Sequence, residues 1–167
     1  CKYDKRLVPG MIVCSTGEVW LKPSHITFQI GLPKTRLAET RASKAVFGVV
    51  AGTVVQYDSS GNVTTSEEEL EYLVNNFIIK PAFPGYGVTA GIDPDHKHIA
   101  VNSLGEGVIW VTNSQGTIEN GDYIVSSIIK GYGCKQENDI MRNCTVAKCT
   151  EKINWDAIKD TITVGNK

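Results

Sequence analysis

Short apolar runs separated by glycine and polar residues dominate the chain, and this alternation predicts β-strands rather than helices. The runs that we expect to form a strand or a pair of strands are residues 10–21, 44–57, 97–113, 116–127 and 143–151. Their close spacing predicts short strands of one sheet, with turns at Gly105, Gly107, Gly116 and Gly121.

Glycine-containing signals inside these runs predict how the strands turn. The Ser-Thr-Gly at 15–17 lies between two apolar runs and predicts a hairpin. Gly48 and Gly52 interrupt a valine-rich run and indicate bulges or bends. The Asn-Gly at 120–121 is typical of a type I′ hairpin turn, in which both central residues need a positive φ.

One segment, residues 66–77, has the periodicity of a helix. Ser66 is a suitable N-cap, and three glutamates follow it in the first turn, where the helix dipole favours negative charge. The apolar face would be formed by Leu70, Leu73, Val74 and Phe77. We therefore expect a mainly β fold, a compact antiparallel β-sandwich or barrel-like domain with one helix at about residues 66–77.

The Val-Ile-Trp-Val at 108–111 predicts a strand that is apolar on both faces, since Val108 and Trp110 alternate with Ile109 and Val111. We expect such a strand to be buried on both sides, by a second sheet or by another subunit. Trp110 is then a core or interface anchor.

Composition excludes some classes of partner. The 167 residues fit a single domain covering residues 1–167, and the net charge of −1 without a block of Lys or Arg predicts no nucleic-acid partner. No apolar run approaches the roughly 18 residues of a membrane span, so no membrane partner is expected. The five cysteines have no zinc-like spacing and indicate reduced thiols of a cytosolic environment, with a Cys134–Cys144 disulfide as the alternative.

The most metal-like patch is Asp-Pro-Asp-His-Lys-His at 93–98. On a strand, His96 and His98 share one face, and with Asp95 they are candidate ligands for zinc or iron. The alternative is an Asp-Pro turn leading into a strand with exposed histidines. On that second interpretation, which we favour, the chain needs no cofactor.

Three residues are candidates for catalysis. Glu106, between two glycines, is either a general acid or base or a turn residue whose neighbours supply positive φ. Asp122 follows the Asn-Gly turn, and its expected role is to bond that turn's backbone, with catalysis as the alternative. Cys1 would be a nucleophile if it were a processed terminus, whereas the simpler interpretation is that the sequence merely begins there.

Residues 101–150 contain four motifs that together resemble a known family. They are NSLGEGVIWV at 102–111, IENGDYIVSS at 118–127, GYGCKQEND at 131–139 and CTVAK at 144–148. Residues 8–20 and 44–54 are similar to the opening strands of the same family, more weakly. The chain thus resembles the C-terminal intramolecular-chaperone, autoproteolytic (peptidase G2-like) domains of phage tailspikes and neck appendages, and looks closest to relatives in large DNA viruses.

The resemblance implies a domain at the C-terminus of a long fibrous viral protein, which trimerises and is released by self-cleavage in many members. Its partners would be two copies of itself and the upstream segment of its own precursor, in the virion or in the host-cell cytoplasm during virus assembly. If the domain trimerises before the upstream segments fold, the local concentration of those segments rises, and this offsets the entropic cost of threading three chains together.

The chain departs from the family pattern in two places. The family's cleavage signal is an Asp-Tyr-Ala-Glu-like stretch near the domain start, whereas this chain begins CKYDKR, with Tyr3 and Asp4 but no Ala-Glu. The resemblance therefore assigns no catalytic residue. Residues 58–97, which include the expected helix, look like an insertion.

Two other functions stay open at this stage. One is a hydrolase or metal-dependent enzyme that uses Asp93, His96, His98 and Glu106. The other is a receptor- or glycan-binding fibre tip in which exposed aromatic residues and loops make the contacts.

Overall fold

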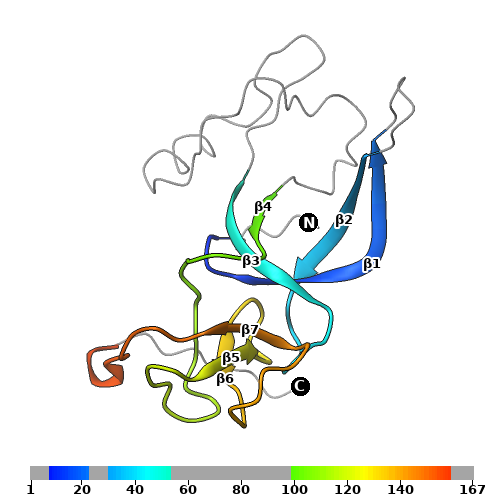
Figure 1. Cartoon of the computed structure of the whole chain (residues 1–167). Coiled ribbons are helices and arrows are strands. Elements are labelled where there is room, and N and C mark those ends of the chain that lie inside the picture. Colours follow the sequence, from blue (N-terminus) through cyan, green and yellow to red (C-terminus); the bar gives the residue numbers. More distant parts are fainter. Residues whose placement is uncertain (1–7, 23–29, 54–98, 159–167) are drawn as a thin grey trace.

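The computed structural model describes residues 8–22, 30–53 and 99–158, which form two antiparallel sheets and a short 3₁₀ helix (Figure 1). The elements are β1 (Ile12–Lys22), β2 (Ile30–Leu37), β3 (Val46–Thr53), β4 (Ile99–Asn102), β5 (Tyr123–Ser126), β6 (Gly133–Lys135), β7 (Thr145–Lys148) and η1 (Trp155–Ala157). The first sheet has the order β2-β1-β3-β4 and the second β6-β5-β7. The predicted mainly β, antiparallel domain is confirmed. The helix expected at 66–77 and the insertion at 58–97 lie outside the described residues.

The start of β1, with Met11 before it, is buried on both faces. Met11 and Val13 belong to one apolar cluster, and Ile12 and Cys14 belong to another. Because successive side chains of a strand point to opposite faces, the two clusters lie on the two sides of the first sheet. β2 and β3 flank this part of β1 in the ladder, so a central strand here requires an uninterrupted apolar run.

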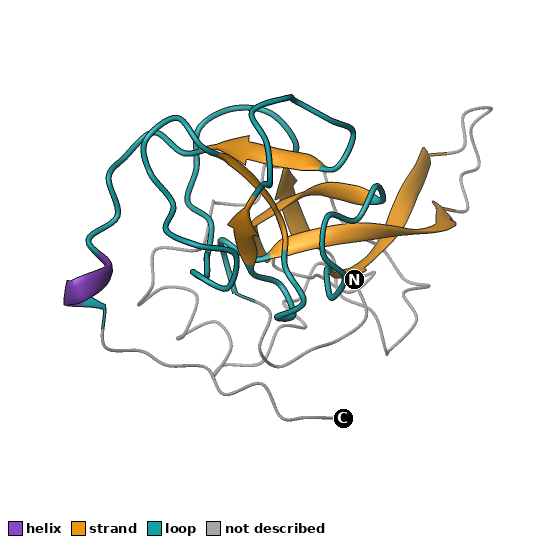
Figure 2. Ribbon diagram, turned by 90° about the horizontal axis from the view of Figure 1, so that it is seen from below, coloured by secondary structure: helices purple, strands orange, loops and turns teal. Residues whose placement is uncertain are grey.

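Backbone hydrogen bonds attach the second half of the chain to the start of β1. Ile12 N–H donates to Gly131 O at 2.8 Å, and Gly131 N–H donates to Ala38 O at 2.6 Å. Gly131 has a φ of +81°, and a Cβ there would lie 3.1 Å from Cγ of Met11, so this position favours glycine. Figure 2 shows the strands of both sheets gathered in one body, with η1 at its edge.

A buried serine of β5 fastens the loop between β2 and β3. Ser126 Oγ accepts a hydrogen bond from Ser43 N–H at 3.0 Å and donates one to Thr40 O at 2.8 Å. The carbonyl of Ser126 also accepts one from Ala42 N–H at 2.9 Å. These bonds hold Ala42 at a φ of +50°, a left-handed conformation that costs a residue with a Cβ about 1 kcal/mol.

β1 is one continuous strand, so the hairpin predicted at 15–17 is wrong. Its ladder with β2 pairs Ser15 with Thr35 and Val19 with Pro33. Four steps along β1 therefore match two steps along β2, and the surplus residues form a bulge.

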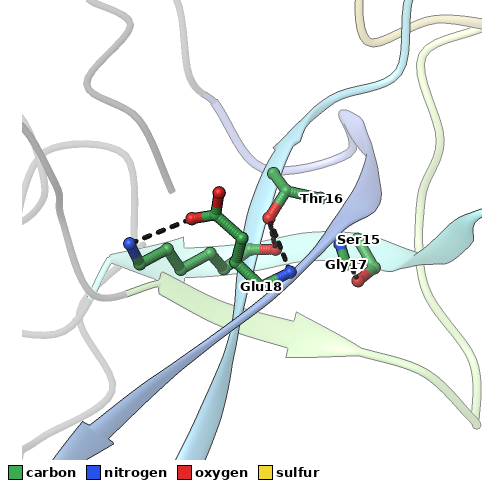
Figure 3. A network of polar contacts seen from close by, with 5 residues as sticks. Ser15, Thr16, Gly17 and Glu18 are labelled. Carbon is green, nitrogen blue, oxygen red and sulfur yellow. Dashed lines mark hydrogen bonds and ion pairs between the residues drawn. The ribbon is translucent and has the colours of Figure 1, made fainter.

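Side-chain hydroxyls satisfy the backbone inside this bulge, as Figure 3 shows. Ser15 Oγ accepts from Gly17 N–H at 3.1 Å, and Thr16 Oγ1 accepts from Glu18 N–H at 3.3 Å. Thr16 Oγ1 also donates to Lys34 O at 3.1 Å, and the carboxylate of Glu18 pairs with the Lys34 ammonium at 3.1 Å. Residue types that favour turns thus serve here to keep a bulged strand hydrogen-bonded.

The bulges predicted in β3 are confirmed. An extra residue lies beside each glycine, Phe47 next to Gly48 and Ala51 next to Gly52. A Cβ on Gly48 would lie 2.5 Å from Asn102 O, so the backbone of β4 can approach β3 only because this residue is glycine.

The strand–turn–strand predicted for residues 97–113 is wrong in its second half. β4 ends at Asn102, and the pairing described for residues 103–113 is an isolated parallel bridge from Val111 to Gly133 of β6. Residues 103–110 connect the two sheets, so Gly105 and Gly107 do not turn successive strands of one sheet.

The turn at Asn120 and Gly121 is not of type I′. Gly121 has a φ of +96°, but the φ of Asn120 is not positive. Asp122 N–H donates to Glu119 O at 3.1 Å, which closes a four-residue turn with the φ pattern of type II. This turn leads into β5 from an irregular segment and does not join two ladder strands.

We expect Ile12→Ala to lower the free energy of unfolding by about 2–5 kcal/mol, because it leaves a cavity in a fully buried site. Ile128→Ala, at an exposed isoleucine, is the matched control and should change it by less than about 0.5 kcal/mol. Urea denaturation followed by circular dichroism measures both, and equal effects would contradict a core centred on β1.

Candidate interaction surface around Trp110

Residues 103–111 run from β4 to the second sheet, and backbone hydrogen bonds fix the end of this crossing (Figure 1). Trp110 N–H donates to Gly10 O at 3.1 Å, and Trp110 O accepts from Gly133 N–H at 2.7 Å. Thr112 N–H then donates to Gly133 O at 2.9 Å. The peptide of Trp110 is therefore held between the approach to β1 and the start of β6.

The indole ring of Trp110 is fixed as firmly as its backbone. Its Nε1–H donates to Pro9 O at 2.8 Å, and its ring lies 6.3 Å from that of Tyr132 at a tilt of 53°. Gly10, with a φ of +90°, makes room for it, because a Cβ there would lie 2.9 Å from the indole Cδ1. Despite these contacts, 49% of Trp110 is exposed.

Two more large apolar side chains on the same crossing are exposed. Leu104 is 95% and Val108 is 76% exposed. We refer to Leu104, Val108 and Trp110 as the Trp110 patch. Three large exposed apolar residues within seven consecutive positions are more than the single exposed apolar residues that a surface ordinarily carries.

Within the described part of the chain, residues 108–111 are not buried on both faces as the sequence pattern predicts. Ile109 and Val111 are half-buried, and Ile109 packs against the cluster of Ile12 and Cys14. Val108 and Trp110 are exposed, so the described residues cover only one side of this run. Burial of that side by another subunit stays a prediction.

Glu106 lies in the middle of the Trp110 patch and is exposed. Gly105 beside it has a φ of +115°, so the chain bends there as the turn interpretation requires. The Glu106 carboxylate makes no hydrogen bond or ion pair within the described residues. Its role as an acid or base stays a prediction.

Asp122 has the structural role that its position predicts. Its carboxylate accepts a hydrogen bond from Glu119 N–H at 2.7 Å and pairs with the Lys135 ammonium of β6 at 2.8 Å. Burial raises the pKa of Asp122, but the hydrogen bonds and the Lys135 charge outweigh it and leave the pKa below its usual 3.8. The hydrogen bond between the Asp122 and Lys135 side chains raises the pKa of Lys135. Asp122 and Glu106 are not joined by any described contact, so the structure does not bring these two catalytic candidates together.

The other predicted site residues are not all described. Cys1, Asp93, Asp95, His96 and His98 lie outside the described residues, and the described ranges contain no group of three possible metal ligands. Likewise, no helix in those ranges is long and apolar enough to cross a membrane.

All four cysteines in the described ranges are free thiols, and the alternative of a Cys134–Cys144 disulfide is wrong. Cys134 is fully buried, and its Sγ lies 3.8 Å from Ser126 O. Burial raises the pKa of the Cys134 thiol, although the neighbouring Arg41 acts in the opposite direction. The protonated, buried thiol packs as a small apolar group.

Sequence reasoning missed a second exposed apolar site, in residues 137–143 between β6 and β7. Ile140 is 65% and Met141 is 71% exposed. The loop that carries them is tied to a buried glutamine, Gln136, whose Nε2 donates to Ile140 O at 2.7 Å. The one signal in the sequence is an apolar pair inside an otherwise polar loop, which alone predicts nothing about contacts.

Compared with known proteins, the chain matches no family model, and no curated protein or solved structure is significantly similar to it. The resemblance to the chaperone domains of phage tailspikes therefore stays a prediction that is carried by the motifs at residues 102–148.

We expect Trp110→Phe to lower the free energy of unfolding by about 0.5–1.5 kcal/mol in addition to the effect of the smaller ring, because Pro9 O loses its hydrogen-bond donor. Trp155→Phe is the matched control, since the buried Nε1 of Trp155 makes no hydrogen bond with the described chain. Thermal denaturation of the two variants compares them, and a larger loss in the Trp155 variant would contradict the assigned role of the indole N–H.

Asp122→Asn should destabilise the fold at neutral pH and matter less in acid. The folded pKa lies below the unfolded one, so the charged carboxylate contributes fully above about pH 3.8 and loses its contribution as the pH falls further through the folded value. Unfolding of wild type and variant from pH 7 down to pH 2.5 should give curves that converge. A constant difference would mean that the charge of Asp122 is irrelevant.

Proposed function

We propose that this chain is an assembly domain that associates with copies of itself as a homotrimer and brings the upstream segments of its precursor into register. The observation that carries the proposal is the Trp110 patch. Its indole is held by a hydrogen bond to Pro9 O and lies beside the tilted ring of Tyr132, yet Trp110 stays half exposed, and Leu104 and Val108 are exposed as well. A fibrous viral precursor is the setting that the sequence motifs suggest.

The fixed indole makes this patch suited to protein contact. Ordering a flexible side chain at an interface costs roughly 0.5–1.5 kcal/mol, and Trp110 has already lost that freedom within its own chain. Large aromatic residues in pre-formed positions are the commonest energetic centres of protein interfaces. Val108 and Leu104 add apolar area whose burial contributes about 25 cal/mol per Å².

Registration follows from trimerisation without any further chemistry. Chains joined at one end share an effective concentration of roughly millimolar at the neighbouring residues, whereas separate chains at cellular concentrations meet far more rarely. The loop-closure cost of the first upstream contact falls accordingly.

The proposal includes no catalytic step. Asp122 is committed to a turn and an ion pair, and Cys1 lies outside the described residues. Self-cleavage, a metal-dependent hydrolase and a glycan-binding tip therefore rest on sequence motifs alone.

The double variant Leu104→Ser/Val108→Ser should convert a trimer into monomers while the fold is retained, because both side chains are exposed in one copy. We expect wild type to have three times the chain mass by light scattering coupled to size exclusion. Ile128→Ser, at an exposed isoleucine outside the patch, is the control and should stay trimeric. A monomeric wild type across the micromolar range would refute the proposal.

The same variants test registration. A collagen-like peptide of Gly-Pro-Pro repeats, fused in front of residue 1, folds only as three chains in register. The wild-type fusion should melt at a higher temperature than the free peptide, and its melting should lose its dependence on concentration. The Leu104→Ser/Val108→Ser fusion should melt like the free peptide.

A further inference from the structure

The dipeptide Asn120-Gly121 is open to a rearrangement that few other dipeptides undergo readily in neutral water. The backbone nitrogen after an asparagine can attack the carbonyl carbon of the asparagine side chain, and glycine hinders this attack least because it has no Cβ. No other asparagine in the sequence precedes a glycine. The proposed assembly gives this dipeptide no role.

The fold requires the residue that makes Asn120 reactive. Gly121 has a φ of +96°, a conformation in which a residue with a Cβ is strained, so the turn favours glycine at this position. Asn120 and Gly121 are both exposed to water, and a Cβ added to Gly121 would meet no heavy atom within 4 Å. Among the described residues, therefore, no side chain shields the reacting atoms.

A hydrogen bond of the reacting nitrogen restrains the rearrangement instead. Gly121 N–H donates to Cys149 O at 2.8 Å, and Cys149 N–H donates back to Asp122 O at 2.8 Å. The Gly121 nitrogen must leave this acceptor before it can reach Cγ of Asn120. The folded chain therefore blocks the attack for as long as the two bonds hold.

The two bonds lie where a sheet opens most easily. β7 ends at Lys148, which pairs with Tyr123, so Cys149 stands just beyond the last pair of the ladder. Local opening concentrates at such ends and costs less free energy than unfolding of the whole chain. The turn itself is held by Asp122, whose carboxylate bonds Glu119 N–H at 2.7 Å and the Lys135 ammonium at 2.8 Å.

We propose that Asn120 is a site of spontaneous deamidation, which the bond from Gly121 N–H to Cys149 O holds back until the end of β7 detaches from the turn. In the reaction, the Gly121 nitrogen forms a bond to Cγ of Asn120, and the side-chain nitrogen leaves as ammonia with the proton of the attacking nitrogen. Water then opens the cyclic imide at either carbonyl, which leaves aspartate or isoaspartate at position 120. Water is the one reactant besides the chain itself.

Either product weakens the turn before β5. Aspartate at position 120 adds a carboxylate to a turn that already carries those of Glu119 and Asp122, and like charges at such short range repel. Isoaspartate adds a carbon atom to the backbone between Glu119 and Gly121, which displaces Gly121 N–H from Cys149 O. Because the reaction does not reverse, the modified fraction measures how long the turn has been open.

Incubation of the chain at mildly alkaline pH, folded and in concentrated urea, tests the site. Residue 120 should deamidate in urea and at least about tenfold more slowly in the folded chain, because the nitrogen is released only in rare openings. Peptide mapping by mass spectrometry locates and quantifies the product. No deamidation of residue 120 in urea, or equal rates in the two conditions, overturns the proposal.

A variant that loosens the turn tests the restraint. Asp122→Ala removes the acceptor of Glu119 N–H and the partner of Lys135, so the folded chain should deamidate at least about threefold faster relative to its own rate in urea. Asp139→Ala is the matched control. It removes the same charge from an exposed residue that is also close to Lys135 but lies outside the turn, and it should leave this ratio unchanged.

Circular dichroism checks that each variant is folded. If Asp122→Ala does not fold, Lys135→Met replaces it, because this variant removes the ion pair and keeps the bond to Glu119 N–H. The ratio of folded to urea rates should rise in this variant as well. A folded variant of either kind with the wild-type ratio, or an equal rise in Asp139→Ala, overturns the restraint by the turn.

Discussion

The structure depends on four residues, 11–14, being buried on both faces. Met11 and Val13 fill one apolar cluster and Ile12 and Cys14 fill the other, so both sides of the first sheet pack on the same short run. Its backbone is equally engaged. Met11 O accepts from Val50 N–H at 2.8 Å, and Ile12 O accepts from Ala38 N–H at 2.9 Å. No polar residue fits such a run, because neither face offers water to its side chain.

The position of the Trp110 patch follows from this central strand. Gly131 reaches Ile12 through a backbone hydrogen bond, which places β6 next to the start of β1. The chain leaving β4 must then pass between Gly10 and Gly133, where its backbone finds both partners. An extended crossing alternates its side chains, so one side packs on the core and the other faces outward. Half of the apolar side chains at 108–111 are therefore exposed because of the path that this connection takes, and not because the core is loosely packed.

Sequence patterns predicted the elements that local chemistry controls. The unbroken apolar run at 11–14, the bulges at Gly48 and Gly52 and the strand at 145–148 all follow from residue type and spacing. The hairpin at 15–17 was wrong because hydroxyl groups satisfy a bulge as well as they satisfy a turn, and sequence does not distinguish the two. The predicted type of the turn before Asp122 was wrong as well, although the hydrogen bond between the Asp122 side chain and the backbone of its own turn was predicted.

Sequence could not predict what covers an apolar face, since alternation defines faces and not neighbours. Trp110 was recognised as an anchor, but only the structure shows that Val108 and Trp110 are exposed while Ile109 packs inward. The loop held by Gln136 gave still less warning, because its rigidity comes from a buried amide that bonds residues two and four positions further along. Such contacts depend on the fold and leave no periodic trace in the sequence.

Glu106 illustrates why an exposed carboxylate belongs in an apolar patch. An uncharged patch of Leu104, Val108 and Trp110 would bind many apolar surfaces and promote aggregation. A charge at its centre penalises every partner that cannot supply a cation, because the carboxylate would lose water without compensation. Charges of this kind contribute more to specificity and to the rate of encounter than to affinity. Gly105, with a φ of +115°, lets the chain bend next to Glu106, whose carboxylate stays at the surface.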